Sequence, residues 1–180
     1  EGEIYPFILL AKDDVGYFDL VKVCCDINLS EDKCISLKSL SLYKEHLFVI
    51  SGCVEGIVER LVAKEMEDQA VKYLQLLKNE FQENYYVMLQ NHHLKYQETF
   101  NERMISLAKY VKVKIICSNE VRYLKKQDAL AIDLMQASLQ GVTLDGKYEP
   151  VTQEKYLKTE AEMSQLFDRE IIEETKQVLD

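Results

Sequence analysis

The sequence is poor in the residues and patterns that mark several classes of protein. Its 180 residues include two prolines, six glycines and no tryptophan, which excludes collagen-like and linker-like chains. Apolar runs stay far short of the roughly 20 residues that a membrane-spanning helix needs. The usual motifs of phosphate-binding loops, dinucleotide-binding turns, serine hydrolases and zinc proteases are also missing.

Basic charge is in short supply as well. The chain carries 22 Lys and Arg against 31 Asp and Glu, a net charge of −9. An acidic chain is poorly suited to grip a phosphate backbone, and aromatic residues do not alternate with basic ones as they do in single-strand binders. We therefore expect any contact with DNA to be made through other domains.

The cysteines are odd in number and form no C-x-x-C pair. They are Cys24, Cys25, Cys34, Cys53 and Cys117. This pattern disfavours a disulfide framework and predicts reduced thiols in a cytoplasmic protein.

Short apolar runs alternate with longer segments of helical spacing. The predicted strands cover residues 5–11, 47–50, 85–89 and 114–117, and the predicted helices cover 16–29, 54–64, 66–82, 97–112 and 127–140, with Gly141 as the cap of the last. Such alternation is typical of βα units and predicts an α/β fold with a mainly parallel sheet. Residues 142–152 are polar and predict a loop. Residues 155–180 are charged and predict a helical appendage outside the βα core.

Three of the helices show an apolar stripe that predicts a buried face. In residues 97–112 the stripe consists of Phe100, Met104, Leu107 and Val111. In residues 66–82 the stripe consists of Met66, Ala70, Leu74, Leu77 and Phe81. In residues 16–29 it consists of Tyr17, Leu20, Val21, Cys24 and Ile27.

Polar residues follow each predicted strand, and loops that follow parallel strands gather at one edge of a sheet. These residues are Lys12, Asp13 and Asp14; Ser51, Gly52 and Cys53; Gln90, Asn91, His92 and His93; and Ser118, Asn119, Glu120 and Arg122. Cysteine, histidine and glutamate at one mouth are the ligand types of a metal site, although no pair of them has a specific ligand spacing.

Each of these residues also has a structural interpretation. Cys53 beside a glycine is typical of a small buried residue at a tight turn. His92 and His93 point in opposite directions if the strand continues, so one of them is expected to be a partly buried hydrogen-bonding histidine. Asp13, like Asp14, is typical of a turn or a helix cap.

Glu120 and Arg122 are two residues apart and fall on the same side of an extended segment. This spacing favours an ion pair with neighbouring groups over a catalytic role. Arg122 cannot bind a metal, because its guanidinium stays protonated and has no acceptor.

Short motifs follow one another in order from about Tyr5 to Phe167. They are L-L-A-K at residues 9–12 with Gly16, Tyr17 and Leu20; S-G-C at 51–53 with Gly56; Y-V-M-L-Q at 86–90; S-N-E-V-R-Y at 118–123 with D-A at 128–129; and Y-L-K at 156–158 with Glu162, Met163, Leu166 and Phe167. Together they resemble the PHP (polymerase and histidinol phosphatase) domain of the alpha subunit of bacterial DNA polymerase III, the C-family replicative polymerase.

This resemblance implies part of a distorted (β/α)₇ barrel whose mouth can hold a metal cluster. Cys53 matches a metal ligand of the family, while Glu120 stands in place of an aspartate, Arg122 in place of a histidine, and Pro6 in place of a histidine that often precedes the first strand. Cys53 and Glu120 are thus candidate vestigial ligands, and His92 and Asn119 are further mouth residues. The family's H-x-H and G-x-E motifs are expected upstream of Glu1.

The implied function is that of a scaffold with a lost metal site within a replicative polymerase. Residues 1–145 would form the PHP-like domain, and residues 146–180 a linker and the start of the polymerase module. No cofactor is expected in this segment, whereas the parent polymerase would use Mg²⁺ on carboxylates elsewhere. The implied partners are the rest of the polymerase chain, DNA through other domains, the sliding clamp and other replisome subunits, with no membrane.

Two alternatives remain open at this point. One is a metal-dependent PHP phosphoesterase or 3′–5′ exonuclease that uses Zn²⁺ or Mn²⁺ at Cys53, Glu120 and His92 together with upstream ligands. The other is a free-standing adaptor derived from the same fold. A phosphatase assay with added Mn²⁺ separates the enzyme from the scaffold and the adaptor.

Overall fold

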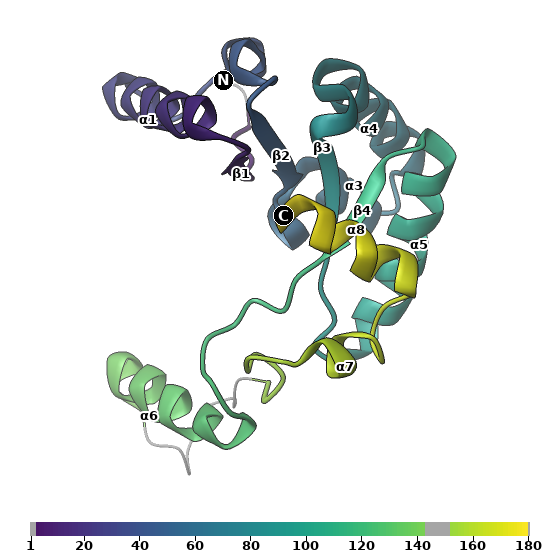
Figure 1. Cartoon of the computed structure of the whole chain (residues 1–180). Helices are drawn as coiled ribbons and strands as arrows, with labels where there is room; N and C mark the ends of the chain where they lie inside the picture. The colour runs from purple at the N-terminus through teal and green to yellow at the C-terminus, as the bar shows by residue number, and fades with distance from the viewer. Residues whose placement is uncertain (1–2, 143–151, 180) are drawn as a thin grey trace.

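A computed structural model describes residues 3–142 and 152–179 as a mixed α/β fold (Figure 1). Within these ranges the strands β1 (Phe7–Ala11), β2 (Leu47–Ser51), β3 (Tyr85–Leu89) and β4 (Lys114–Cys117) form one sheet in the order β1-β2-β3-β4. Each strand lies where the apolar runs predict it. The described strands form an open sheet, and the partial barrel stays a prediction.

Among the described helices, five begin and end within three residues of the predicted bounds, whereas the short helix at residues 37–40 has no predicted counterpart and the segment at 155–180 holds two separate helices. The described helices are α1 (Asp14–Leu29), α2 (Leu37–Leu40), α3 (Ile57–Ala63), α4 (Glu67–Phe81), α5 (Lys95–Val111), α6 (Ala129–Gln140), α7 (Glu160–Met163) and α8 (Arg169–Leu179). Gly141 adopts the left-handed φ of 66° that ends α6, as predicted. Most of the predicted loop at 142–152 lies outside the described residues.

The sheet of the described residues is mainly parallel, as predicted, and β1 is its antiparallel strand. Strands β2, β3 and β4 are parallel, but β1 is antiparallel to β2, with Phe7 opposite Ser51 and Ala11 opposite Leu47. The reason is that residues 30–46 bring the chain back to the end of β1 at which α1 began. The backbone N–H of Lys12 donates to the carbonyl of His46 at 3.0 Å, so β2 starts where β1 ends.

The main core lies between one face of the sheet and helices α3, α4 and α5. The sheet contributes Val49, Tyr85, Val87, Leu89 and Ile115. Most of the predicted stripe of α4 is buried, namely Ala70, Leu74, Leu77 and Phe81, whereas Met66 is 37% exposed.

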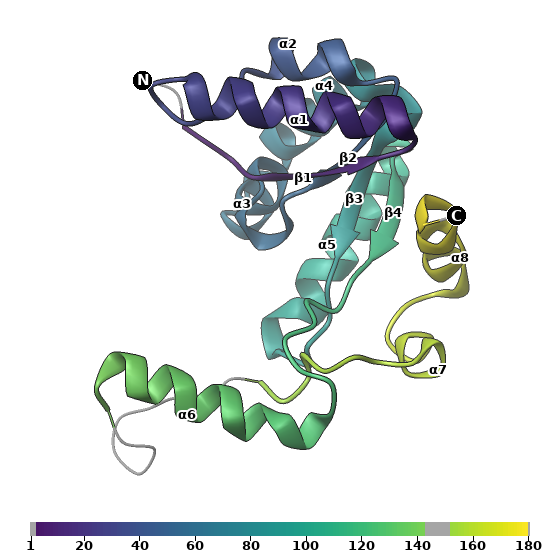
Figure 2. The ribbon, with the colours of Figure 1, turned by 60° about the vertical axis from the view of Figure 1, so that its left-hand side comes forward.

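Helix α1 turns a different face to the core from the one predicted. Its buried residues are Gly16, Asp19 and Val23, while Tyr17 and Val21 are exposed. The start of the helix sets this orientation: a Cβ on Gly16 would lie 2.1 Å from the carbonyl oxygen of His46. Only a glycine permits such a close approach of helix and backbone. Figure 2 shows α1 running alongside β1.

The C-terminal segment packs on the sheet rather than outside it. Helix α8 lies against β4 (Figure 2), and Phe167, Ile171 and Ile172 belong to the main core. The hydroxyl of Thr175 accepts the backbone N–H of Cys117 at 3.0 Å. The predicted appendage outside the core is therefore wrong, because the apolar residues of this charged segment fall on one side of α8. The domain boundary at residue 145 stays a prediction.

The opposite face of the sheet forms a second, smaller buried cluster. It carries Ile50, Tyr86, Met88 and Ile116, with Leu10, Phe48, Cys53 and Val178 packed against them. Helix α6 stands away from this sheet (Figures 1 and 2) and exposes Leu130, Leu134, Met135 and Leu139. Within the described ranges, no helix is both long and apolar enough to cross a membrane.

Candidate functional site

The loops that follow β2, β3 and β4 meet at one edge of the sheet, which we call the mouth. A pocket of about 670 Å³ opens there. Its polar wall includes Gly52, Cys53, Gln90, Ser118, Glu120 and Arg122, and its floor includes Ile8, Leu10, Ile50, Met88 and Ile116. The parallel part of the sheet thus brings Cys53, Glu120 and Arg122 to one pocket, whereas His92, His93 and Asn119 do not line it.

Residues after β1 do not reach the mouth. Because β1 is antiparallel to β2, Lys12, Asp13 and Asp14 lie at the opposite edge, where the ammonium of Lys12 donates to the carbonyl of Glu45 at 3.0 Å. Asp13 caps α1 by accepting the backbone N–H of Gly16 at 2.7 Å. The expected gathering of all four loops is therefore wrong for this one, and the cap interpretation of Asp13 is confirmed.

Pro6 reaches the mouth for the same reason. The start of β1 lies beside the end of β2, so that a Cβ on Gly52 would come within 2.3 Å of the Pro6 carbonyl oxygen. At the position that the resemblance gives to a histidine, the chain therefore offers close backbone packing and a side chain without a metal-binding atom.

Cys53 sits at a strained turn directly after β2. Its φ is 52°, in the left-handed region, and it begins a 3₁₀ turn over Cys53–Glu55. Burial, together with the nearby charges of Glu59 and Glu120, raises the pKa of the thiol to about 12. The thiol is therefore protonated at neutral pH, and it is the thiolate that attacks substrates or binds metals.

The sequence analysis missed a buried carboxyl group that lies close to this turn. Glu59 on α3 is 2% exposed, and burial raises its pKa to about 7, against a hydrogen bond from Ser51. Its Oε1 has no hydrogen-bond partner among the described residues. One signal in the sequence could have indicated this burial: Glu59 lies on α3 beside Val58 and Val62, two apolar residues that are both buried.

The carboxylate of Glu120 is occupied on both oxygens. Its Oε1 accepts hydrogen bonds from Arg122, at 3.1 Å from Nε and 2.7 Å from Nη2. Its Oε2 accepts from the ammonium of Lys155 at 2.8 Å. Burial alone would raise the pKa of Glu120, but the hydrogen bonds from Lys155 and Arg122 outweigh it and lower the pKa. The ion pair that the spacing of residues 120 and 122 favours is present.

His92 is buried and uses both ring nitrogens within the protein. Its Nε2 lies 3.2 Å from the carbonyl of Asn119, and its Nδ1 lies 3.5 Å from Nε2 of Gln97. Burial lowers the pKa of the imidazole, so the neutral ring donates through Nε2. His93 is exposed, with φ of 57°. His92 is thus the buried hydrogen-bonding histidine that the structural interpretation predicts.

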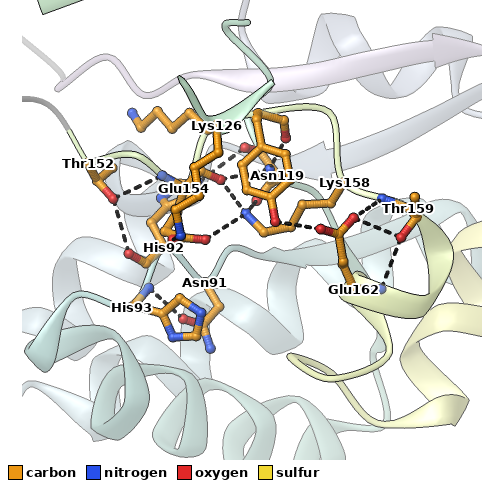
Figure 3. Close-up of polar contacts among 12 residues, drawn as sticks. Asn91, His92, His93, Asn119, Lys126, Thr152, Glu154, Lys158, Thr159 and Glu162 are labelled. Carbon is orange, nitrogen blue, oxygen red and sulfur yellow. Dashed lines mark hydrogen bonds and ion pairs between the residues drawn. The ribbon is translucent and has the colours of Figure 1, made fainter. Parts of the chain in front are cut away.

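Asn119 binds the chain's own C-terminal segment. Its Nδ2 donates to the carbonyls of Glu154 at 2.9 Å and Tyr156 at 2.6 Å, and its Oδ1 accepts from Lys158 at 3.1 Å. Figure 3 shows Asn119, Glu154 and Lys158 facing one another. The amide is therefore engaged in holding residues 152–158 in place.

Comparison with known proteins agrees with the motifs. The chain is 29% identical over 170 residues to the DNA polymerase III subunit alpha of Borreliella burgdorferi, across 91% of this chain and 15% of that protein. It is 25% identical over 171 residues to that of Rickettsia bellii and 27% identical over 168 residues to that of Thermus aquaticus, across 92% and 91% of this chain. The resemblance to DNA polymerase III subunit alpha is confirmed.

The likeness to alpha subunits covers both the sheet and the C-terminal segment, but it is a likeness to part of a longer protein. The chain spans about 15% of the length of these relatives. No family model matches the chain.

The described mouth residues do not fit the metal cluster that a PHP domain implies. Across residues 3–142 and 152–179, no three His, Cys, Asp or Glu side chains lie close enough together to hold a metal ion. Glu120 is bound by two cations, and both ring nitrogens of His92 have partners within the protein.

Proposed function

We propose that the chain is the PHP-domain segment of the catalytic alpha subunit of a bacterial DNA polymerase III, which acts in chromosomal DNA replication. We further propose that it serves there as a scaffold whose metal site has been lost. Similarity to alpha subunits over nine tenths of the chain supports the first part. The capture of the Glu120 carboxylate by Arg122 and Lys155 is the observation that carries the second.

The chemistry of the mouth explains why it would repel a metal. A divalent cation would have to displace two protein cations from Glu120, and the guanidinium of Arg122 keeps its charge at any relevant pH. Two positive charges within a few ångströms of a third ion disfavour its binding. The protonated thiol of Cys53 would also have to lose its proton first.

Catalysis and DNA binding would then belong to the rest of the polymerase. Nucleotidyl transfer would use Mg²⁺ bound by carboxylates in the polymerase module, and DNA would be held by other domains, in keeping with the net charge of −9 here. The sliding clamp and other replisome subunits would be reached through the parent protein, in the cytoplasm.

The test is metal content combined with phosphatase activity. We expect the purified protein, incubated with Zn²⁺ or Mn²⁺ and then desalted, to retain far less than one metal ion per chain. We also expect it to show no Mn²⁺-dependent hydrolysis of p-nitrophenyl phosphate, with Cys53→Ser as the matched control. Stoichiometric tightly bound metal, or Mn²⁺-dependent activity that Cys53→Ser abolishes, would instead establish the phosphoesterase alternative.

A further inference from the structure

Residues 152–158, which we call the strap, lie against the loops that follow β3 and β4, two of the three loops of the mouth (Figure 3). We propose that the mouth has become the docking site of this strap, with the ammonium groups of Lys155 and Lys158 in the place of a bound cation. This inference rests on the proposed loss of the metal site. It adds what the altered mouth now binds.

Backbone pairing fixes the register of the strap. Tyr156 forms an isolated parallel bridge with Tyr123. The N–H of Arg122 donates to the carbonyl of Lys155 at 2.8 Å, and the N–H of Leu157 donates to the carbonyl of Tyr123 at 3.0 Å. This register places Lys155 beside Glu120.

Lys155 is the more enclosed of the two cations on Glu120. Its side chain is 21% exposed, whereas that of Arg122 is 62% exposed. Ion pairs in full contact with water contribute little, because solvent screens them and the long side chains lose entropy. The pair between Lys155 and Glu120 is better shielded and is the stronger tie between strap and mouth.

Lys158 is enclosed further still. Its side chain is 3% exposed, and its ammonium lies 3.1 Å from Oδ1 of Asn119 and 3.3 Å from Oε2 of Glu154. The same ammonium donates to the carbonyl of Glu154 and lies 4.3 Å from the centre of the Tyr156 ring. A buried ammonium is tolerated only where such partners surround it, so the strap and Asn119 together form a built site for it.

The strap also determines the path of the chain that follows. From Lys158 the chain passes through α7 to α8, which covers β4. Docking at the mouth and packing of α8 therefore hold this stretch at both ends. The mouth, on this view, acts as a structural joint.

Amide hydrogen exchange of the purified full chain tests the joint. The amides of Arg122 and Leu157 report directly on the strap, because their hydrogen bonds cross the junction. We expect Lys155→Met to speed their exchange by at least about tenfold, since it removes the charge and keeps the aliphatic stem. Glu120→Gln should have at least the same effect, because it also releases Arg122. The double variant should exchange no faster than Glu120→Gln alone, because Lys155→Met then has no ion pair with Glu120 left to remove.

Lys78→Met is the matched control. Lys78 also has a side chain that is 21% exposed and pairs with Glu83 at 2.7 Å, away from the strap, so its loss should leave the two amides unchanged. Two results would overturn the inference. One is that Lys155→Met leaves the exchange rates of the two amides unchanged, and the other is that the effects of Lys155→Met and Glu120→Gln on these rates add in the double variant. Either result would leave the proposed function standing, because that proposal is tested by metal content and not by exchange.

Discussion

At the scale of single residues, Glu59 is a carboxyl group that the fold buries. Burial raises its pKa from 4.5 to about 7. Because the folded state holds this proton more tightly than the unfolded state, the stabilisation is fully present below pH 4.5 and is lost as the pH rises through about 7. The difference between the two pKa values corresponds to roughly 3 kcal/mol at most.

The free energy of unfolding of the wild type should therefore fall between pH 5 and pH 8. We expect this fall to be smaller in Glu59→Gln, since the amide has nearly the same shape as the carboxyl group and cannot ionise. Urea unfolding at both pH values measures this. Glu98→Gln, on the exposed side of α5, is the control and should leave the wild-type slope intact. A slope in Glu59→Gln equal to that of the wild type would show that Glu59 does not hold its proton in the fold.

Single residues also show what the sequence could reveal about the mouth. The structural interpretation of His92 follows from its position after an apolar strand, where burial is the common outcome. The partner of Glu120 could be predicted only in part. Arg122 lies two residues away, but Lys155 is 35 residues further along the chain and belongs to a segment expected to lie outside the core.

At the scale of elements, the junction between β1 and β2 depends on close backbone packing. A Cβ on Gly52 would meet the Pro6 carbonyl oxygen at 2.3 Å and its Cγ at 2.8 Å. Backbone atoms cannot yield as a flexible side chain can, so we expect Gly52→Ala to destabilise the protein by about 2–4 kcal/mol.

Gly141→Ala is the matched comparison for this prediction. Gly141 has a φ of 66° but no atom within 4 Å of the added Cβ, so the change should cost only about 1 kcal/mol of backbone strain. Chemical denaturation of both variants measures the difference. Equal losses at the two positions would mean that β1 does not pack on Gly52 as described.

Elements were predictable wherever their signal is local. The four apolar runs and the stripe of α4 give positions and buried faces directly. The direction of β1 depends instead on how residues 30–46 return the chain, and the buried face of α1 depends on the contact of Gly16 with His46. Both are tertiary effects, which hydrophobic periodicity cannot reveal.

At the scale of the whole molecule, the mouth is a charged surface whose Glu120 carboxylate is already paired within the chain. Under the proposed function, the mouth contributes structure and no chemistry. Cys53 is then the most informative position, because it is the ligand that the resemblance carries over unchanged and its thiol is protonated.

We expect Cys53→Ser in the complete polymerase to leave Mg²⁺-dependent primer extension within about twofold of the wild type, since substitutions outside the reacting centre mainly alter stability. Gly52→Ala, one residue away, should lower the melting temperature and should reduce extension only near that temperature. Primer extension at several temperatures, beside thermal unfolding of the same samples, separates the two effects. A Cys53→Ser enzyme that stays folded but loses extension at every temperature would show that the mouth takes part in the reaction.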